Sequence, residues 1–301
     1  MIPFVRDFDF TYGEPEAVSP LIRRVVANNP GPFTFTGTGV YIIGHGTVAV
    51  IDPGPDLPDH WQALLSALDG EQVSHVFVTH GHLDHSPLAR RLARHFGAKV
   101  YASPQVPIPT DSEVRLEAGD DLDFRPDVGL KDADTFTGPG WTLTALATPG
   151  HTSGHICYAL AEEQALFSGD HIMGWSTSVI SPPDGDMSDY MNSLRRILAM
   201  NFQTLWPTHG PPITTPQPFI EAYIAHREAR EAAILSYLQN GPTTIPAMVK
   251  QIYADVDTSL HPAACHSVLA HMIKLLKDGR VATDSTTPDL TSQYRLRPQA
   301  A

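Results

Sequence analysis

The run Thr79-His80-Gly81-His82-Leu83-Asp84-His85 places four potential metal ligands within six consecutive positions. Residues 73–78 before it alternate and are rich in β-branched and aromatic side chains, which predicts a buried strand. After it, Ser86 is typical of an N-cap and Pro87 of a first helical position, so residues 88–96 are predicted to be helical. The ligands are therefore expected on a strand-to-helix loop, where a rigid scaffold holds several side chains at one point.

The spacing inside this run divides the four ligands into two pairs. His80 and His82 leave an extended backbone on the same side, so they can bind one ion. Asp84 and His85 enter the helical turn and point elsewhere, which suits a second ion nearby. A single histidine is usually a surface or core residue, and the chain has 15 of them. Three histidines and an aspartate in one loop are better explained as metal ligands, because imidazole is the commonest of these.

This spacing resembles the H-x-H-x-D-H signature of the metallo-β-lactamase superfamily. Three later segments extend the resemblance, each at the end of a predicted strand: Pro149-Gly150-His151, Ser168-Gly169-Asp170 and Pro207-Thr208-His209. The four blocks stand in the family's order between residues 33 and 212. A bridging carboxylate at Asp170 is similar to the glyoxalase II and nuclease branches, and the C-terminal part resembles the beta-lactamase-like protein 2 group.

The resemblance implies a site for two metal ions. His151 would complete the site of the ion bound by His80 and His82. His209 would join Asp84 and His85 on the second ion, with Asp170 as the bridge. The implied ligands are His80, His82, Asp84, His85, His151, Asp170 and His209. The expected cofactors are two divalent ions, Zn²⁺ first, with Fe or Mn as alternatives because the same ligands accept all three.

Other residues are expected to support this site. Asp52 ends the second strand of a predicted hairpin, and the resemblance implies that it buttresses the ligand loop through hydrogen bonds, a role compatible with capping the strand. His155 is expected to be structural, and His171 to point away from the ions, towards the residues behind them or the substrate. Residues 176–178 are candidates, by position alone, to touch the substrate.

The resemblance implies the α+β fold class and a four-layer αβ/βα sandwich, and the small C-terminal helical domain resembles a winged helix. The catalytic domain is predicted to span residues 1–218 and the C-terminal domain residues 219–301. Within the catalytic domain, residues 114–116 are strand-like and residues 125–140 are expected to form a loop insertion. The predicted C-terminal elements are helices over 219–238, 245–253 and 263–277 and a hairpin of 280–283 with 294–297.

Composition restricts the classes of protein to consider. Hydrophobic residues make up 42% and charged residues 18%, and no run of eighteen apolar residues is present, so no membrane span is expected. The first residues lack the pattern of a secretory signal, and the two cysteines each stand in an apolar run, which together predict a cytoplasmic protein. The formal net charge of −13 argues against a general nucleic-acid-binding surface.

The predicted helix over residues 263–277 carries only Lys274 and Lys277 as basic residues. A winged helix that reads DNA should carry a clearly basic recognition helix. DNA binding is therefore not expected, and a role beside the substrate or in the packing of a homodimer is favoured.

The predicted enzyme is a metal-dependent hydrolase in which a hydroxide bridging two ions attacks a small or anionic ester, thioester or phosphodiester. Asp84 is the predicted catalytic residue, because it can also hold the proton of the nucleophile, and no Ser or Cys nucleophile is needed.

The beta-lactamase-like protein 2 group includes a single-strand endoribonuclease, so single-stranded RNA is the alternative substrate. A glyoxalase II-type thioesterase is less favoured because no C-terminal Lys/Arg cluster is evident. A DNA-associated regulator is disfavoured because structural zinc sites are normally closed by four ligands.

Overall fold

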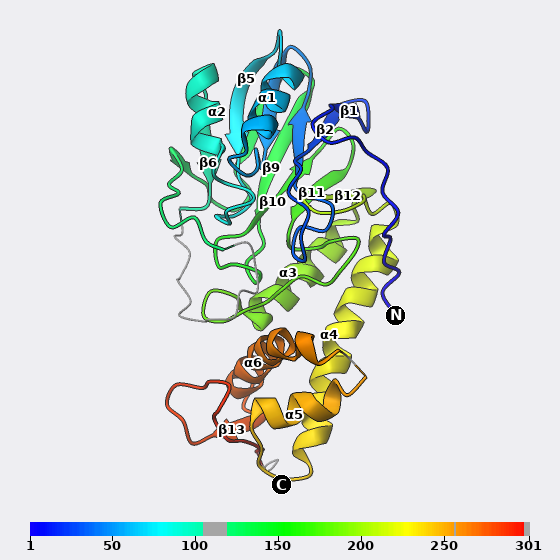
Figure 1. The fold of residues 1–301 in the computed structure, drawn as a ribbon, viewed down its shortest axis with the longest axis vertical. Helices are drawn as coiled ribbons and strands as arrows, with labels where there is room; N and C mark the ends of the chain where they lie inside the picture. The colour runs from blue at the N-terminus through cyan, green and yellow to red at the C-terminus, as the bar shows by residue number, and fades with distance from the viewer. Residues whose placement is uncertain (105–118, 256, 298–301) are drawn as a thin grey trace.

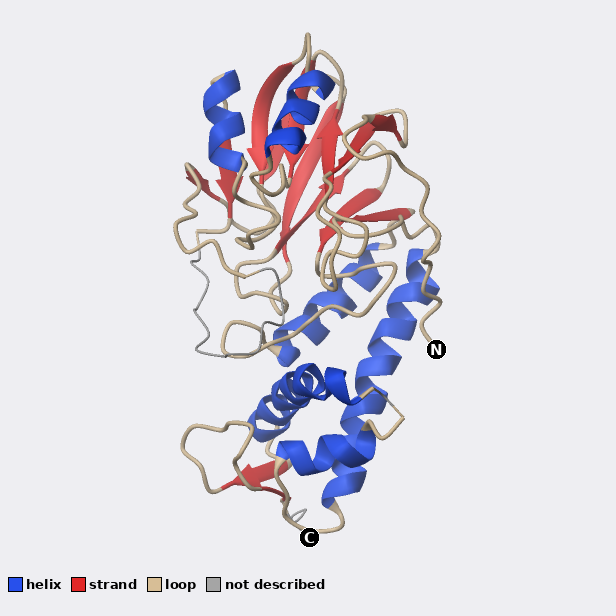
Figure 2. Cartoon of the chain, in the orientation of Figure 1, coloured by secondary structure: helices blue, strands red, loops and turns tan. Residues whose placement is uncertain are grey.

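Two β-sheets lie face to face in the computed structural model, which describes residues 1–104, 119–255 and 257–297. Helices cover the outer side of each sheet, and one long helix connects this sandwich to a smaller helical part that contains the C-terminus (Figures 1 and 2). The strand-like residues 114–116 lie outside the described part of the chain. No helix of that part is both long and apolar enough to span a membrane.

The first sheet follows chain order from β1 to β7. Its strands are β1 (Glu16–Ala17), β2 (Ile22–Val26), β3 (Gly39–Ile43), β4 (Thr47–Ile51), β5 (Gln72–Phe77), β6 (Lys99–Ala102) and β7 (Val128–Gly129). The predicted hairpin is the β3–β4 pair. From β4 onwards the strands are parallel, because α1 (Pro58–Ala67) and α2 (Ala89–Phe96) provide the crossovers. The carboxyl ends of β4 and β5 therefore meet at one edge.

The second sheet has the order β12-β11-β10-β9-β8. Its strands are β8 (Thr135–Gly138), β9 (Trp141–Ala147), β10 (Ile156–Leu160), β11 (Ala165–Gly169) and β12 (Thr204–Pro207). The pairs β9–β10 and β10–β11 are antiparallel and β11–β12 is parallel, so β9, β11 and β12 all run in one direction. Their carboxyl ends share an edge, which is where the predicted ligands follow. Helix α3 (Met187–Met200) connects β11 to β12 and starts at Asp186, whose carboxylate accepts hydrogen bonds from two first-turn amides.

Three apolar layers hold the sandwich together. Tyr41, Phe77 and Tyr158 belong to the layer between the sheets. A second layer packs α1 and α2 on the outer face of the first sheet. A third packs α3 and the first half of α4 (Pro216–Leu238) on the second sheet. Strands such as β3 and β11 are buried on both faces, which explains why their sequences are largely apolar. The structure confirms the four-layer sandwich.

The C-terminal part begins within α4 and contains α5 (Ile245–Ile252), the short 3₁₀ turn η1 (Thr258–Leu260), α6 (His261–Lys277) and the predicted hairpin of β13 (Val281–Thr283) with β14 (Tyr294–Leu296). Early in α4, Phe219 and Tyr223 pack with the sandwich, whereas Ile234 and Leu238 join the C-terminal core. One helix therefore contributes to both cores, and the predicted boundary at 218/219 falls at its start. That division of the chain stays a prediction.

Two local predictions were wrong. Ser86 does not cap the helix, which begins at Ala89 after Leu88. Instead the Ser86 hydroxyl donates to the His82 carbonyl and to Asp121, because the ligand loop turns back on itself there. Residues 125–140 are not a plain loop, since they contain β7 and β8. In β8 the threonines are exposed and Phe136 is half-buried, so this short segment adds an edge strand to the second sheet.

Candidate metal centre

The seven predicted ligands come from four strand ends, and the structure brings all of them together. His80, His82, Asp84 and His85 follow β5, His151 follows β9, Asp170 follows β11, and His209 follows β12. All seven side chains are buried. Because these strands end at the same edge of the two facing sheets, residues distant in sequence meet in one place.

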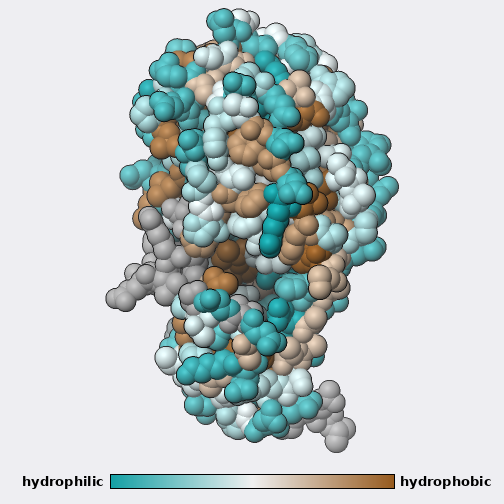
Figure 3. Space-filling model, turned by 45° about the vertical axis from the view of Figure 1, so that its right-hand side comes forward, coloured by the Kyte–Doolittle hydropathy of each residue, from teal (hydrophilic) through white to brown (hydrophobic). Residues whose placement is uncertain are grey.

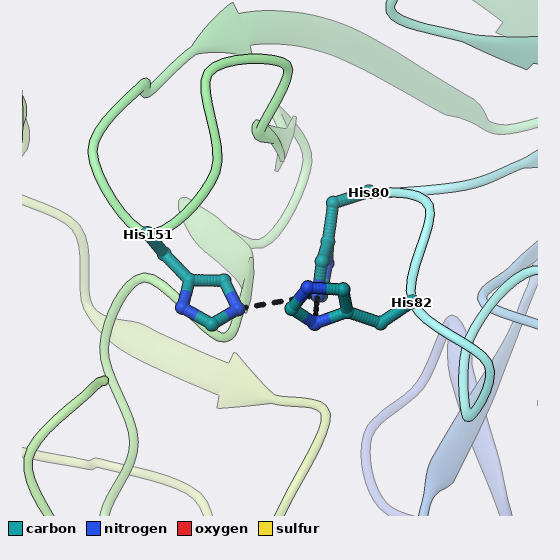
Figure 4. Close-up of side chains that lie close together, drawn as sticks. All are labelled: His80, His82 and His151. Atoms are coloured by element: carbon teal, nitrogen blue, oxygen red, sulfur yellow. Dashed lines mark hydrogen bonds between the residues drawn. The ribbon is translucent and has the colours of Figure 1, made fainter. Parts of the chain in front are cut away.

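Three histidines direct ring nitrogens at one another. The His80 Nε2 atom lies 2.9 Å from His82 Nδ1 and 3.3 Å from His151 Nε2 (Figure 4). His80 and His82 come from the loop after β5, and His151 comes from the opposite sheet. Three imidazole nitrogens so arranged can bind one ion from three sides.

A second group lies beside the first and contains carboxylates. The His209 Nε2 atom lies 3.1 Å from Asp84 Oδ2 and 3.4 Å from Asp170 Oδ1. The His85 Nε2 atom is 3.6 Å from Asp84 Oδ1 and 3.7 Å from Asp170 Oδ1. The other oxygen of Asp170, Oδ2, lies 3.9 Å from His151 Nε2 in the first group. Asp170 thus directs one oxygen towards each group.

The remaining ring nitrogen of each histidine contacts a polar group behind the site. These outer contacts are His80 with the Thr79 hydroxyl (3.0 Å), His82 with Asp120 (3.4 Å), His85 with Asp52 (2.9 Å), His151 with the Val179 carbonyl (2.7 Å) and His209 with the Gly37 carbonyl (3.1 Å). Such contacts fix ring orientation and leave the inner nitrogen as an electron-pair donor, as in protein metal sites.

Asp52 ties the two sheets together directly beneath the ligands. Its carboxylate accepts hydrogen bonds from the Thr79 amide (2.7 Å), the Thr79 hydroxyl (2.8 Å) and the Thr208 hydroxyl (2.9 Å), and contacts His85 Nδ1. Thr79 and Thr208 immediately precede the ligands His80 and His209. The predicted supporting role of Asp52 is therefore present in the structure, and it extends to the second sheet.

Several donor atoms of the two ligand groups have no hydrogen-bond partner within the protein. Asp84 Oδ1, His85 Nε2, Asp170 Oδ1 and His209 Nε2 are buried and have no hydrogen-bond partner of suitable geometry. Burial raises the pKa of Asp84, but the adjacent His85 and His209 rings outweigh it and bring this pKa to about 2. Burial lowers the pKa of His85, yet Asp84 and Asp52 raise it to about 10. Carboxylates and imidazoles so placed are suited to binding metal ions.

Three residues beside the ligands, His155, His171 and Asp120, differ in what they contact. The His155 Nε2 atom accepts a hydrogen bond from the Asp170 amide at 3.2 Å, which positions the bridging candidate and agrees with a structural role. His171 is buried and packs against the Tyr190 ring, with 5.0 Å between ring centroids. Asp120, which contacts His82, was not predicted. It follows a Pro- and Asp-rich stretch that carries no signal linking it to the ligand loop.

A cleft of about 410 Å³ opens onto His82, Asp84, His151 and Asp170. Its walls are largely apolar and include Pro32, Phe33, Met173, Trp175 and Val179. Ser176 and Thr177 border this cleft, whereas Ser178 does not, because its buried hydroxyl donates to the His171 carbonyl. Two of the three candidates for substrate contact thus lie at the mouth of the site.

Comparison with protein families agrees with this geometry. A model described as the metallo-beta-lactamase superfamily matches residues 34–209, which contain all seven candidate ligands. The chain belongs to the metallo-β-lactamase superfamily. A second model, the beta-lactamase associated winged helix domain, matches residues 244–289, so the C-terminal part is the winged-helix domain of this superfamily. Superfamily membership together with relatives named as thioesterases identifies the chain as a metal-dependent hydrolase.

Relatives in the superfamily cover nearly the whole chain. A beta-lactamase-like protein 2 homologue of Caenorhabditis elegans is 33% identical, over 90% of this chain and 90% of its own. An atrochrysone carboxyl ACP thioesterase of a Cryptosporiopsis species is 31% identical, over 90% of this chain and 84% of its own. A beta-lactamase domain protein of Burkholderia ambifaria has the same fold, with a TM-score of 0.80, 19% identity and coverage of 98% and 97%.

Metal binding is expected to release protons and to become tighter as pH rises. Burial lowers the pKa values of His85 and His209, but their carboxylate neighbours raise both above the ordinary histidine range. Both rings are therefore protonated at neutral pH before an ion binds. An ion must displace these protons. Calorimetric titration with Zn²⁺ in buffers of different protonation enthalpy measures the number released, which we expect to be about two at neutral pH. Binding with no proton release would contradict this charge distribution.

Proposed function

We propose that this chain is a binuclear metal hydrolase that cleaves acyl thioesters. The observation that carries the binuclear part is the Asp170 carboxylate, which directs one oxygen towards the His151 group and the other towards His85 and His209. Two divalent ions held there would lower the pKa of a shared water and polarise the carbonyl under attack. We propose Zn²⁺ first, with Fe or Mn as alternatives.

The protein's own residues position the reacting groups. Five imidazoles are fixed by their outer contacts, so the two ligand groups are arranged before substrate binds. The Asp84 carboxylate faces the cleft, and its Oδ1 atom has no hydrogen-bond partner. That oxygen is the proposed acceptor for the proton of the attacking water. Phe33, Trp175 and Val179 line the cleft and exclude bulk water from the carbonyl, which strengthens the electrostatic interactions within it.

A thioester is favoured over the other substrates considered because the apolar cleft suits an acyl chain. A relative that is 31% identical over 90% of this chain is named as an acyl-carrier thioesterase. Single-stranded RNA is the second candidate, supported by the likeness to beta-lactamase-like protein 2 homologues at 33% identity. The formal net charge of −13 slows the approach of a long polyanion, which places RNA behind the thioester.

A substrate panel tests this proposal. The Zn²⁺-loaded chain, and separately the Fe- and Mn-loaded forms, are given an acyl thioester, the matching oxygen ester, a lactam, a phosphodiester and a single-stranded RNA. We expect kcat/KM for the thioester to exceed that for each other substrate by at least about tenfold, since differential transition-state binding decides the preference. Cleavage of RNA without thioester hydrolysis would replace the proposal by its alternative.

The winged-helix domain is proposed to act beside the substrate rather than on DNA. Lys274 of α6 pairs with Glu231 and Asp278, and Lys277 pairs with Asp186 at the start of α3. Both lysines of α6 are therefore neutralised by ion pairs, and the pair of Lys277 with Asp186 connects this helix to the sandwich. A homodimer contact through this domain is an alternative role. The cytoplasm is the proposed location, because both cysteines are buried free thiols.

A further inference from the structure

A second groove lies between the sandwich and the winged-helix domain and is continuous with the metal cleft. It has a volume of about 1260 Å³ including the part open to solvent, and Figure 3 shows apolar surface in the hollow where the two parts of the molecule meet. The residues that line both the groove and the cleft are Pro32, Phe33, Trp175, Ser176, Thr177 and Val179. A ligand in the groove can therefore extend, without leaving the protein surface, to the candidate metal ligands.

The groove is basic in an otherwise acidic chain. Among the described residues its lining includes Arg6, His226, Arg227 and Arg230 and no Asp or Glu, although the chain has 33 acidic and 20 basic residues. The cationic side chains come from the N-terminal segment and from α4. Neither of these elements lines the metal cleft, whose described lining contains no Lys or Arg. Positive charge is therefore present in the groove and absent from the lining of the cleft.

The arginines differ in what they contact. Arg227 is buried, and its Nη2 atom donates to the Ser178 carbonyl at 2.5 Å. This hydrogen bond connects α4 to the loop of residues 176–179 that borders the cleft. Arg230 is half-buried, lies over the Tyr253 ring at 4.7 Å, and has no ion pair or hydrogen bond with a described residue. Arg6 is exposed and likewise has no such partner. Two guanidinium groups thus keep their donors available to a ligand.

The charges of Arg227 and Arg230 affect the pKa of the adjacent His226. Burial lowers the pKa of His226, and the adjacent Arg227 and Arg230 lower it further, to about 4. His226 is therefore neutral at physiological pH, and the same arginine charges attract an anion. Guanidinium groups bind phosphate oxygens through paired hydrogen bonds, which makes phosphate a well-suited ligand.

We propose that this groove binds the phosphate of a phosphate-bearing thioester arm, with Arg230 and Arg6 as its contacts, while the uncharged arm extends along Phe33, Trp175 and Val179 to the metal cleft. The inference rests on the proposed thioesterase function. The basic groove and the apolar cleft together match a ligand that has a charged phosphate at one end and an uncharged chain between that phosphate and the reacting thioester. A nucleic acid carries a charge at every nucleotide and would require cations along the cleft as well.

Direct binding tests the groove without relying on catalysis. The full chain is titrated with 4′-phosphopantetheine and with pantetheine, which lacks the phosphate. We expect the phosphorylated compound to bind at least about tenfold more tightly, as expected for a hydrogen bond to a charged group, and Arg230→Gln to abolish the difference. Arg195→Gln is the matched control, because Arg195 is an exposed arginine that pairs with Glu228 outside the groove. Equal affinity for the two compounds in the unmodified chain would overturn the proposal.

Kinetics separate failure of the groove from failure of the proposed function. For acyl-CoA and for an acyl-carrier protein, Arg230→Gln is expected to raise KM about tenfold with kcat unchanged. For a short N-acetylcysteamine thioester, which has no phosphate, KM should not change. Which of the two phosphate-bearing substrates has the lower KM identifies the source of the arm. Phosphate-dependent binding without hydrolysis of any thioester would support the groove and refute the thioesterase. An equal KM increase for all three substrates would refute the groove.

Arg6→Gln provides an independent variant, because Arg6 lies in an exposed segment and its replacement leaves the packing of α4 intact. It is expected to weaken 4′-phosphopantetheine binding and to leave pantetheine binding unchanged. Loss of affinity for a single-stranded RNA in both variants, with phosphopantetheine binding unaffected, would overturn the proposal in favour of a nucleic-acid groove.

Discussion

Replacement of Asp170 by asparagine is expected to lower kcat/KM for hydrolysis by on the order of 10³-fold or more, with the chain still folded. The amide keeps the size of the side chain but removes its negative charge. It also replaces one of the two oxygens that face the His151 group and the His85–His209 group with an NH₂. An NH₂ cannot bind a cation, so the bridge between the two groups is lost.

Metal analysis checks this prediction alongside the kinetics. We expect the bound metal to fall from about two ions per chain towards one, since the His80, His82 and His151 nitrogens remain in place. His82→Ala should instead impair that first group. Asp132→Asn is the matched control, because Asp132 is a carboxylate that pairs with Arg196 away from the site. An Asp170→Asn enzyme with unchanged activity and two ions would refute the proposed bridge.

Asp52→Ala is expected to destabilise the chain by about 3–5 kcal/mol, the range found when one partner of a buried charged pair is removed. The carboxylate is fully buried, and its removal leaves the Thr79 amide, the Thr79 and Thr208 hydroxyls and His85 Nδ1 without their acceptor. Asp52 also adopts a φ of 49°, a left-handed conformation that aspartate and asparagine tolerate better than alanine.

Two variants separate these contributions in chemical and thermal unfolding. Asp52→Asn retains the backbone preference and the side-chain shape, so it should unfold at a higher denaturant concentration than Asp52→Ala, while its metal affinity falls by about 10–100-fold. Asp289→Ala is the control for hydrogen-bond number. Its exposed carboxylate also accepts four hydrogen bonds, from the amides and hydroxyls of Thr291 and Ser292, so a much smaller destabilisation is expected there. Equal destabilisation at both positions would show that burial is not the cause.

Features that depend on near neighbours could be predicted well. The hairpin of β3 and β4 and the grouping of His80 with His82 follow from alternation and spacing over a few residues. Predictions that required knowledge of competing contacts were less successful. Serine is a common N-cap residue, but the hydroxyl of Ser86 donates to the nearby His82 carbonyl and to Asp121 instead of to the helix. Strand β8 was missed because two threonines and a glycine give a weak pattern, and its pairing with β9 decides its conformation.

By itself the sequence determined the ligand types and their grouping on the β5 loop, since spacing along a strand or loop sets side-chain direction within a few residues. The αβ/βα fold was implied by the resemblance of the four ligand blocks to the metallo-β-lactamase superfamily. Only the tertiary structure decided how those groups combine. Asp52 contacts Thr79 across 27 residues and Thr208 across 156, and Arg6 reaches the same groove as Arg230 on α4. The relative positions of such distant residues depend on how two sheets and a long helix pack, which no local pattern encodes.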